Sequence, residues 1–254
     1  MGSFRPLALA AALIIASVAG LAPAAAESYR VRYDASLFGL PIGRAVLESR
    51  FEGQGFAIAG RFASAGIARI FDRTDGTVTV NGWLGPDASR PHAYTLAYES
   101  GEEEKKTAIR FENDRVTATE NRPEPKKRGD DWVPVEREHL AGVADPLSAL
   151  LLPARDASEV CRRRIRVYDG EMRTDLVLEP AGDRNGFRDA TVTCRARFVP
   201  VSGYRKDRSS IQYLRDRSRI FVGFGPVEGR NLYSPVEATI ATKIGTVHIK
   251  ARRI

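Results

Sequence analysis

The sequence is poor in the residues that bind metals. It contains two cysteines and three histidines among 254 residues, and His92, His139 and His248 lie in separate segments without a close cysteine or second histidine. Neither HExxH nor CxxC spacing occurs. Structural zinc sites take four such ligands, so the sequence predicts no metal site and no cofactor.

Catalytic motifs are also missing. Ser148 lies in an apolar segment without a Gly-x-Ser-x-Gly context, and no glycine-rich stretch has the spacing of a phosphate-binding loop. The carboxylate pairs Asp72 with Asp75 and Asp130 with Asp131 lie in polar loops, which favours solvated surface charges. We therefore expect a protein that is not an enzyme, although a Ser/His/Asp triad is defined by geometry and can assemble from distant segments.

A long apolar run occurs only at the N-terminus. Arg5 precedes the apolar residues Leu7–Leu21, and alanines at positions 24–26 fit the cleavage rule of signal peptides. The run is short for a membrane span, which needs ~20 residues; a membrane anchor or a buried helix is the alternative. We predict a signal peptide over residues 1–26 and export to the periplasm. Residues 27–254 then form one β-rich domain without a membrane span.

Acidic charge is outnumbered by basic charge. Lys and Arg total 39 against 32 Asp and Glu, which gives a formal net charge of +7. This excess fits the basic surface of an exported protein, or affinity for an anionic partner such as lipid headgroups, lipopolysaccharide or acidic polymer. The charges alternate in sign along the chain, which favours the first interpretation. No nucleic-acid-binding motif is present, so we expect no nucleic acid partner.

Short segments of alternating apolar and polar residues dominate the predicted mature chain. They are separated by glycine- and proline-containing turns, which favours an all-β sandwich or barrel. The segments with this pattern are Tyr29–Asp34, Ala45–Phe51, Phe56–Phe62, Thr77–Val80, Tyr94–Tyr98, Ile109–Ala118 around Asn113-Asp114, Asp189–Val199, Ile220–Phe224, Val236–Ile240 and Val247–Ala251.

The segment Cys161–Leu178 is typical of a two-faced hairpin. Asp169-Gly170 is a dipeptide favoured in type I′ turns, which require positive φ at both central positions. Pairing outward from this turn sets Val167 opposite Met172 and Arg164 opposite Asp175. The predicted apolar face carries Cys161, Ile165, Val167, Met172, Leu176 and Leu178. The predicted polar face carries Arg162, Arg164, Arg166, Tyr168, Glu171, Arg173 and Asp175.

The two cysteines, Cys161 and Cys194, both fall on apolar faces of predicted strands. Two such residues facing one core can approach to ~5.5–6 Å between Cα atoms, and an exported protein meets an oxidising compartment. We predict a disulfide whose loop contributes ~3–4 kcal/mol to stability. Two free buried thiols are the alternative.

Two short helices are predicted. Asp145–Pro153 begins with a capping aspartate followed by proline and ends at Pro153, and this apolar helix is expected to plug one end of the core. Ala65–Arg73 has helical spacing of apolar residues, so a short helix or a turn is expected there. In the basic cluster before the hairpin, alternation sends Arg163 toward the core, where it has a structural role or binds an anion.

Several short motifs together resemble one bacterial exported family, domain-of-unknown-function family 3108 (DUF3108). They are Tyr29-Arg30-Val31-Arg32-Tyr33, Leu40-Pro41-Ile42-Gly43-Arg44-Ala45, Asp145-Pro146-Leu147-Ser148-Ala149-Leu150, Val167-Tyr168-Asp169-Gly170 and Gly203-Tyr204-Arg205. The resemblance implies a periplasmic protein of Gram-negative bacteria without an established activity. At the level of the fold, the chain also resembles periplasmic lipoprotein carriers and β-spiral envelope-integrity proteins.

The expected fold is therefore a strongly curved antiparallel sheet or incomplete, β-spiral-like barrel with one or two short helices. The expected function is that of a non-enzymatic envelope protein supporting cell-envelope integrity. It binds a lipid, a lipoprotein segment or a protein partner in its concave sheet. An envelope-polymer hydrolase and an assembly protein contacting anionic envelope material are the alternatives. The sequence predicts no particular oligomeric state.

Overall fold

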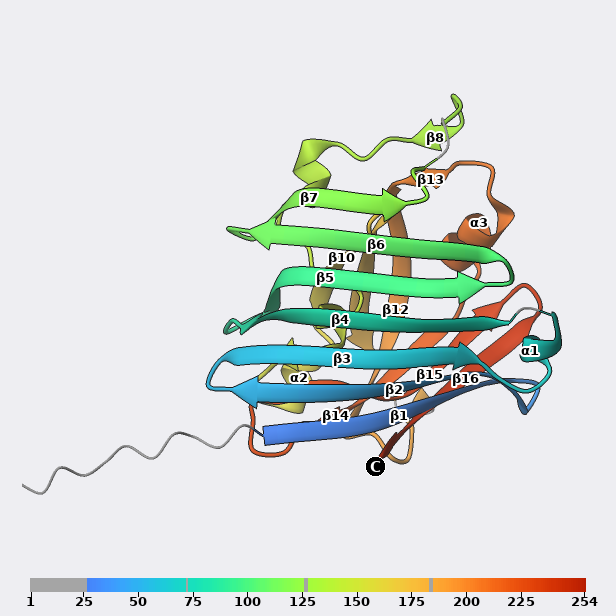
Figure 1. Cartoon of the computed structure of the whole chain (residues 1–254). Helices are drawn as coiled ribbons and strands as arrows, with labels where there is room; N and C mark the ends of the chain where they lie inside the picture. The colour runs from blue at the N-terminus through green and yellow to red at the C-terminus, as the bar shows by residue number, and fades with distance from the viewer. Residues whose placement is uncertain (1–26, 72, 126–127, 183–184) are drawn as a thin grey trace, which may run out of the picture.

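The computed structural model describes residues 27–71, 73–125, 128–182 and 185–254, so the predicted signal peptide lies outside the described residues. Strands dominate the fold (Figure 1). They are β1 (Glu27–Leu37), β2 (Leu40–Glu52), β3 (Gly55–Ser64), β4 (Thr74–Leu84), β5 (Ser89–Ser100), β6 (Glu103–Glu112), β7 (Arg115–Arg122), β8 (Trp132–Val133), β9 (Leu152–Pro153), β10 (Arg163–Tyr168), β11 (Arg173–Pro180), β12 (Val192–Ser202), β13 (Tyr204–Arg205), β14 (Ile220–Pro226), β15 (Leu232–Thr242) and β16 (Gly245–Arg253). The helices are α1 (Ala68–Phe71), α2 (Ala157–Val160), α3 (Ser209–Asp216) and the 3-10 helices Arg137–Leu140 and Ser148–Leu150.

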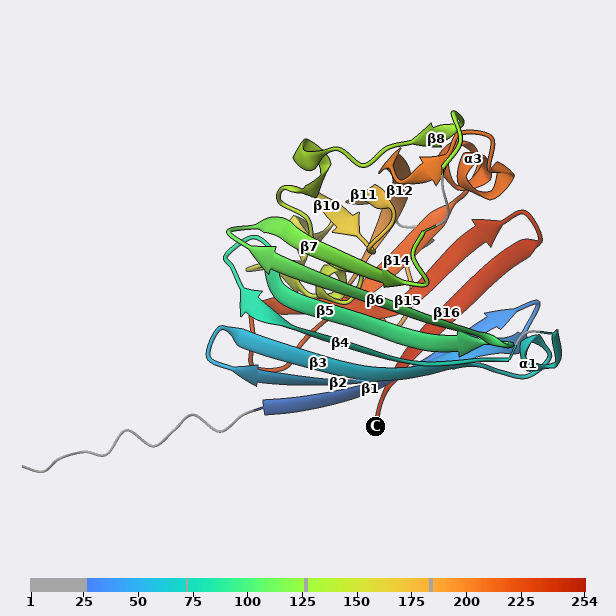
Figure 2. The ribbon, with the colours of Figure 1, turned by 45° about the horizontal axis from the view of Figure 1, so that its top comes forward.

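One antiparallel sheet runs through the molecule. Its strand order is β10-β11-β12-β14-β15-β16-β1-β2-β3-β4-β5-β6-β7, with β9 paired to β15. The strands β1 to β7 form the front wall in Figure 1, and the later strands cross behind them, so the sheet curls round on itself (Figure 2). Its two end strands, β7 and β10, share no ladder among the described residues. The predicted fold class, a curved all-β sheet forming an incomplete barrel, is confirmed.

A short segment of chain bridges the gap between β7 and β10, which we call the seam. On one side Gly142 N donates to Asp114 O at 2.7 Å, beside β7. On the other, Ala144 N donates to Arg166 O at 2.8 Å and Tyr168 N donates to Ala144 O at 2.9 Å, on β10. The seam is therefore closed by backbone hydrogen bonds to an irregular segment, which leaves more space there than a strand pair would.

Apolar side chains of the inner sheet face form two buried clusters. The larger lies between the front wall and the segments 143–151, 168 and 227–232; the smaller surrounds Cys161 and Cys194. The predicted alternation is visible in β3, where Phe56 and Ile58 are buried and Ala57 is exposed. Burial of a large apolar side chain contributes ~1.5–3 kcal/mol, so these inward residues fix which face of each strand points to the core.

The two predicted tight turns have different outcomes. Asn113 and Asp114 both adopt positive φ, 50° and 59°, and join β6 to β7 as a two-residue turn. The prediction of a type I′ turn at Asp169-Gly170 was wrong: Asp169 lacks positive φ, and β10 and β11 are joined by four residues. The carboxylate of Asp169 instead accepts hydrogen bonds from Glu171 N at 2.9 Å and Met172 N at 2.7 Å, which stabilises the longer loop.

The longer loop moves the hairpin register by two residues. Val167 lies opposite Thr174 instead of Met172, and Arg164 lies opposite Val177 instead of Asp175. Because side chains alternate with a period of two, a shift of two keeps every residue on its predicted face. Arg164 still reaches Asp175 diagonally, with Nη1 2.9 Å from Oδ2.

Part of the predicted polar face of the hairpin is buried. Tyr168, Arg173 and Asp175 are all buried. Arg173 Nε donates to His139 O at 3.0 Å. The sequence placed these residues on the solvent side because it gave no sign that the segment around His139 contacts the hairpin.

The helices were predicted in part. The segment predicted as a helix over Asp145–Pro153 is only a 3-10 turn at Ser148–Leu150, followed by β9, although Leu147 and Leu151 enter the core as expected. The short helix expected within Ala65–Arg73 is α1. The longest helix, α3, was missed; its residues Ile211 and Leu214 have helical spacing, but the segment is largely polar.

Candidate functional site

A cavity of ≈ 490 Å³ opens at the seam, between β10 and the ends of β5 and β6. Its wall comes from five separate parts of the chain. The lining residues are Asp87, Ala88, Ser89, Arg90, Pro91, Phe111, Asp114, Gly142, Val143, Ala144, Ser148, Ala149, Leu151, Leu152, Arg162, Arg163, Arg164, Ile165 and Arg166. We call this space the seam cavity.

The base of the seam cavity is apolar. Phe111, Val143 and Leu151 line it and are themselves buried in the larger core cluster. Leu152 and Ile165 extend the apolar lining toward the smaller cluster. This surface is suited to alkyl or aromatic groups rather than to a hydrated ion.

The rim of the seam cavity is cationic. Arg90 pairs with Asp114 and, at 3.4 Å, with Asp87, and Arg164 pairs with Asp175. Arg162 and Arg166 form no ion pair with any carboxylate in the described part of the chain. The guanidinium groups thus exceed the nearby carboxylates, so the rim attracts anions.

Arg163 has a structural role. Its Nη1 donates to Asp87 O at 3.3 Å and Pro153 O at 3.0 Å, and its Nε donates to Glu159 O at 3.2 Å. Burial lowers the pKa of Arg163, with Glu159 and Asp87 acting in the opposite direction. Of the two interpretations that the sequence allowed, these three carbonyl partners favour the structural one.

A buried carboxylate lies directly behind the cavity wall. Asp145 accepts hydrogen bonds from Leu147 N at 2.8 Å and Ser148 N at 3.1 Å, and from Ser148 Oγ at 2.5 Å. Burial raises the pKa of Asp145, and the hydrogen bonds from Ser148 and Leu147 oppose that rise. These contacts cap the 3-10 turn, and within the described residues none of them involves a histidine.

The predicted site residues are not among those that line the seam cavity. Cys161 and Cys194 have sulfur atoms 2.07 Å apart and Cα atoms 5.2 Å apart, at disulfide-bonding distance. Both are buried in the smaller core cluster, as their positions on apolar strand faces led us to expect.

The turn residues Asp169 and Gly170 lie at the far end of the seam. Gly170 has φ of 103°, and its carbonyl accepts hydrogen bonds from Asn121 Nδ2 and Tyr168 Oη, both at 2.9 Å. Asn121 is on β7, so this turn fastens the two edges of the sheet where they approach. A β-carbon at position 170 would lie 2.3 Å from Thr107 Cγ2, so a larger residue there would displace Thr107 and strain the backbone.

Sequence reasoning noticed only one side of the seam cavity. The run Arg162-Arg163-Arg164 was visible as the densest basic cluster. Arg90, Phe111 and Val143 were missed because nothing in the sequence brings these distant segments together. Among the described residues, no three His, Cys, Asp or Glu side chains gather as a metal site. No helix in the same residues has the length and hydropathy to cross a membrane.

The curved sheet with its seam cavity defines a β-barrel-like protein. The chain belongs to the family DUF3108, described as a protein of unknown function, whose model matches residues 28–252. This confirms the resemblance inferred from the short motifs, and the family description indicates no catalytic activity.

No curated protein matches the chain. Among solved structures, the chain is similar to the crystal structure of a beta-barrel-like protein of domain of unknown function DUF1849 from Brucella abortus, with 12% sequence identity and a TM-score of 0.48. The similarity covers 89% of this chain and 98% of that chain.

Proposed function

We propose that this protein is a non-enzymatic periplasmic envelope protein that binds an amphipathic anion, an apolar chain with an acidic headgroup, in the seam cavity. The observation that carries the proposal is the combination of an apolar base with the uncompensated guanidinium groups of Arg162 and Arg166. The signal-peptide pattern of residues 1–26 supports the periplasmic location.

The size and chemistry of the cavity suit such a ligand. Ligand pockets commonly enclose ~300–1,000 Å³, and the seam cavity has ≈ 490 Å³. Arginine forms bidentate, charge-assisted hydrogen bonds to carboxylate or phosphate, while Phe111, Val143 and Leu151 offer apolar surface to the chain of the ligand. The sequence predicted binding in the concave face of the sheet, but the larger core cluster fills that face. We therefore propose the seam cavity as the binding site instead.

The proposal is tested by titrating the protein with a fluorescent long-chain fatty acid. We expect saturable one-to-one binding. The affinity for the fatty acid should fall at least tenfold in the Arg162→Gln, Arg166→Gln double variant. Arg188→Gln with Arg195→Gln is the matched control, because both residues are exposed and lie outside the cavity lining. Equal affinity of the two double variants, or no binding to any form, would reject the seam cavity as the site.

A further inference from the structure

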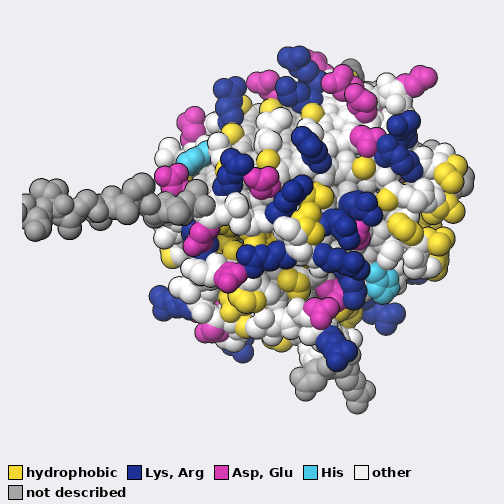
Figure 3. Space-filling model, turned by 60° about the horizontal axis from the view of Figure 1, so that its bottom comes forward, with side chains coloured by type: hydrophobic (Ala, Val, Ile, Leu, Met, Phe, Trp, Pro, Cys, Tyr) yellow, Lys and Arg dark blue, Asp and Glu magenta, His cyan; other side chains and the backbone are white. Residues whose placement is uncertain are grey.

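Three connections expose large apolar side chains at one end of the sheet. They are the β1–β2 turn, the segment around α1, and the β15–β16 turn, which lie together at the right of Figure 1. Hydrophobic side chains gather at the same end in Figure 3. The residues, with exposed fractions between 45% and 80%, are Phe38, Leu40, Ile67, Ile70 and Ile244. We call this patch the apolar tip.

The β1–β2 turn and the start of β2 contact both of the other connections. A β-carbon at Gly245 would lie 2.6 Å from Phe38 Cζ, so the Phe38 ring rests on the β15–β16 turn. A β-carbon at Gly66 would lie 2.5 Å from Pro41 O, and Ala65 N donates to Ile42 O at 3.1 Å. The segment before α1 therefore lies against the start of β2. The apolar tip is therefore continuous, unlike the single exposed apolar residues that are common on protein surfaces.

Phe38 is an unfavourable residue for the turn that it occupies. It has φ of 53° and precedes Gly39, which has φ of 79°. Asn or Gly is favoured at the first position of such a turn, and a bulky residue with positive φ is an outlier. Its side chain is nevertheless 77% exposed, so burial does not compensate. Apart from the contact of its ring with the β15–β16 turn, the chain gives Phe38 little to offset the cost of its backbone conformation.

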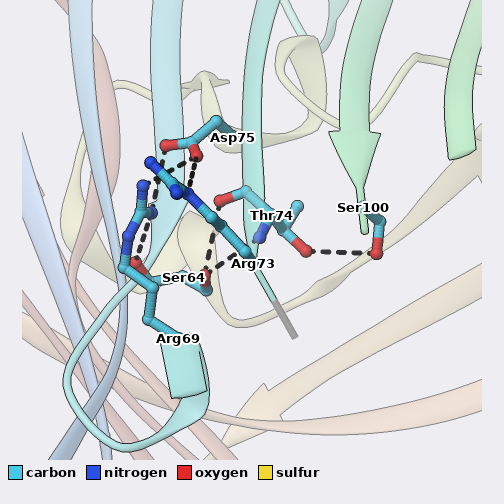
Figure 4. A network of polar contacts seen from close by, with 6 residues as sticks. All are labelled: Ser64, Arg69, Arg73, Thr74, Asp75 and Ser100. Atoms are coloured by element: carbon cyan, nitrogen blue, oxygen red, sulfur yellow. Dashed lines mark hydrogen bonds and ion pairs between the residues drawn. The ribbon is translucent and has the colours of Figure 1, made fainter. Parts of the chain in front are cut away.

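A polar network holds the α1 part of the apolar tip in place (Figure 4). Arg69 binds Asp75 through two hydrogen bonds, of 3.1 and 2.8 Å, and also donates to Ser64 O at 3.2 Å. Thr74 N donates to Ser64 Oγ at 3.0 Å, which ties α1's flanking strands together. These contacts fix the turn that carries Ile67 and Ile70, so its apolar side chains are presented in an ordered arrangement.

The outer face of β16, β1, β2 and β3 beside the apolar tip is basic. Arg32 lies directly opposite Arg252, and Arg61 stands in the same row across β2. Like charges directly opposite each other are destabilising. Nearer the apolar tip, Asp34 lies between Arg44 and Lys250. Asp34 pairs with Arg32 and with Arg44, at 2.9 Å each, and Lys250 pairs with Glu237 at 3.3 Å. Arg61 and Arg252 form no ion pair with a carboxylate of the described residues, so an anionic surface would supply them with counter-charges. Figure 3 shows Lys and Arg side chains, interspersed with Asp and Glu, across this side of the molecule.

We propose that the apolar tip inserts into the interfacial region of a lipid bilayer, with the adjoining basic face against anionic phospholipid headgroups. Charge favours this occupant: a second copy brings a net charge of the same sign, +7, whereas anionic lipid brings the opposite one. Apolar side chains give depth of insertion and basic side chains give attraction at the surface. The proposal concerns a different surface from the seam cavity and stands without it.

The experiment is co-sedimentation of the chain lacking residues 1–26 with vesicles of phosphatidylcholine and of phosphatidylcholine mixed with phosphatidylglycerol. We expect binding to the mixed vesicles at least tenfold tighter than to phosphatidylcholine alone. The triple variant Phe38→Asn, Ile70→Asn, Ile244→Asn should bind the mixed vesicles at least tenfold more weakly than the unchanged protein, without a lower melting temperature. Ile254→Asn is the matched control, because this residue is also exposed and lies past the opposite end of β16.

Three results would overturn the proposal. One is sedimentation of the triple variant with the mixed vesicles as efficiently as the unchanged protein. Another is the absence of vesicle binding by the unchanged protein. The third is a dimer of the unchanged protein that the triple variant abolishes while vesicle binding persists, which would make a second copy the occupant. Fatty-acid binding in the seam cavity should be the same in all variants, so failure here leaves the proposed function separately testable.

Discussion

Arg173 and Asp175 form an ion pair inside the protein, with Nη1 2.6 Å from Oδ1 and both side chains 6% exposed. Burial lowers the pKa of Arg173, and its pairing with Asp175 opposes that change. Arg164 reaches the same carboxylate from the surface. Asp175 therefore joins the hairpin's two strands to the rim of the seam cavity.

Removing the carboxylate of Asp175 should destabilise the folded protein. Asp175→Ala leaves the buried guanidinium of Arg173 without its counter-charge, which typically costs ~3–5 kcal/mol. Urea unfolding measures the loss. Arg173→Met combined with Asp175→Leu removes both charges and should lower the free energy of unfolding less than Asp175→Ala alone. A double variant that is less stable than Asp175→Ala would contradict this account.

The disulfide should form in the exported protein and contribute to its stability. Closing the loop between Cys161 and Cys194, separated by 33 positions, is worth ~3–4 kcal/mol in the chain-entropy model. We expect no titratable thiol in unfolded, unreduced protein taken from the periplasm, and a loss of that order on reduction. Cys161→Ser with Cys194→Ser should be insensitive to reductant. Two titratable thiols in the unreduced sample would disprove the pairing.

The buried Asp145 should make stability depend on pH in a defined direction. Burial raises its pKa in the folded state, so the fold opposes ionisation. The contribution of Asp145 to stability is present at low pH. It is lost as pH rises from the pKa of the unfolded state, ~3.9, through the pKa of the folded state. Asp145→Asn does not ionise, so its stability relative to the unchanged protein should increase across this window and then level off. Urea unfolding at several pH values tests this, and parallel curves for the two proteins would contradict it.

The turn at Phe38 offers a test that separates folding from binding. Asn accepts positive φ more readily than Phe, and an unfavourable left-handed residue costs ~1–2 kcal/mol. Phe38→Asn should therefore raise the melting temperature while weakening vesicle binding. Gly39→Ala, at the other left-handed position, should lower the melting temperature. A less stable Phe38→Asn protein would show that the aromatic ring stabilises the fold through its contact with Gly245.

Much of the fold follows from local sequence. Alternation located most strands, Asn113-Asp114 predicted its turn, and the faces of Cys161 and Cys194 placed both in one cluster. The hairpin register could not be predicted, because it depends on whether the Asp169 side chain hydrogen-bonds to the backbone. The seam cavity was also beyond local reasoning. It exists because β7 and β10 do not pair, and that gap is set by how the whole sheet curls.

Native mass spectrometry of the protein purified from the periplasm tests the central claim most directly. We predict an added mass corresponding to one anionic amphiphile, recoverable by lipid extraction, which is absent from the Arg162→Gln, Arg166→Gln protein and retained by the Arg188→Gln, Arg195→Gln protein. The bare polypeptide mass in all three samples, or an adduct that persists when both rim arginines are replaced, would contradict the assignment of the seam cavity as a binding site.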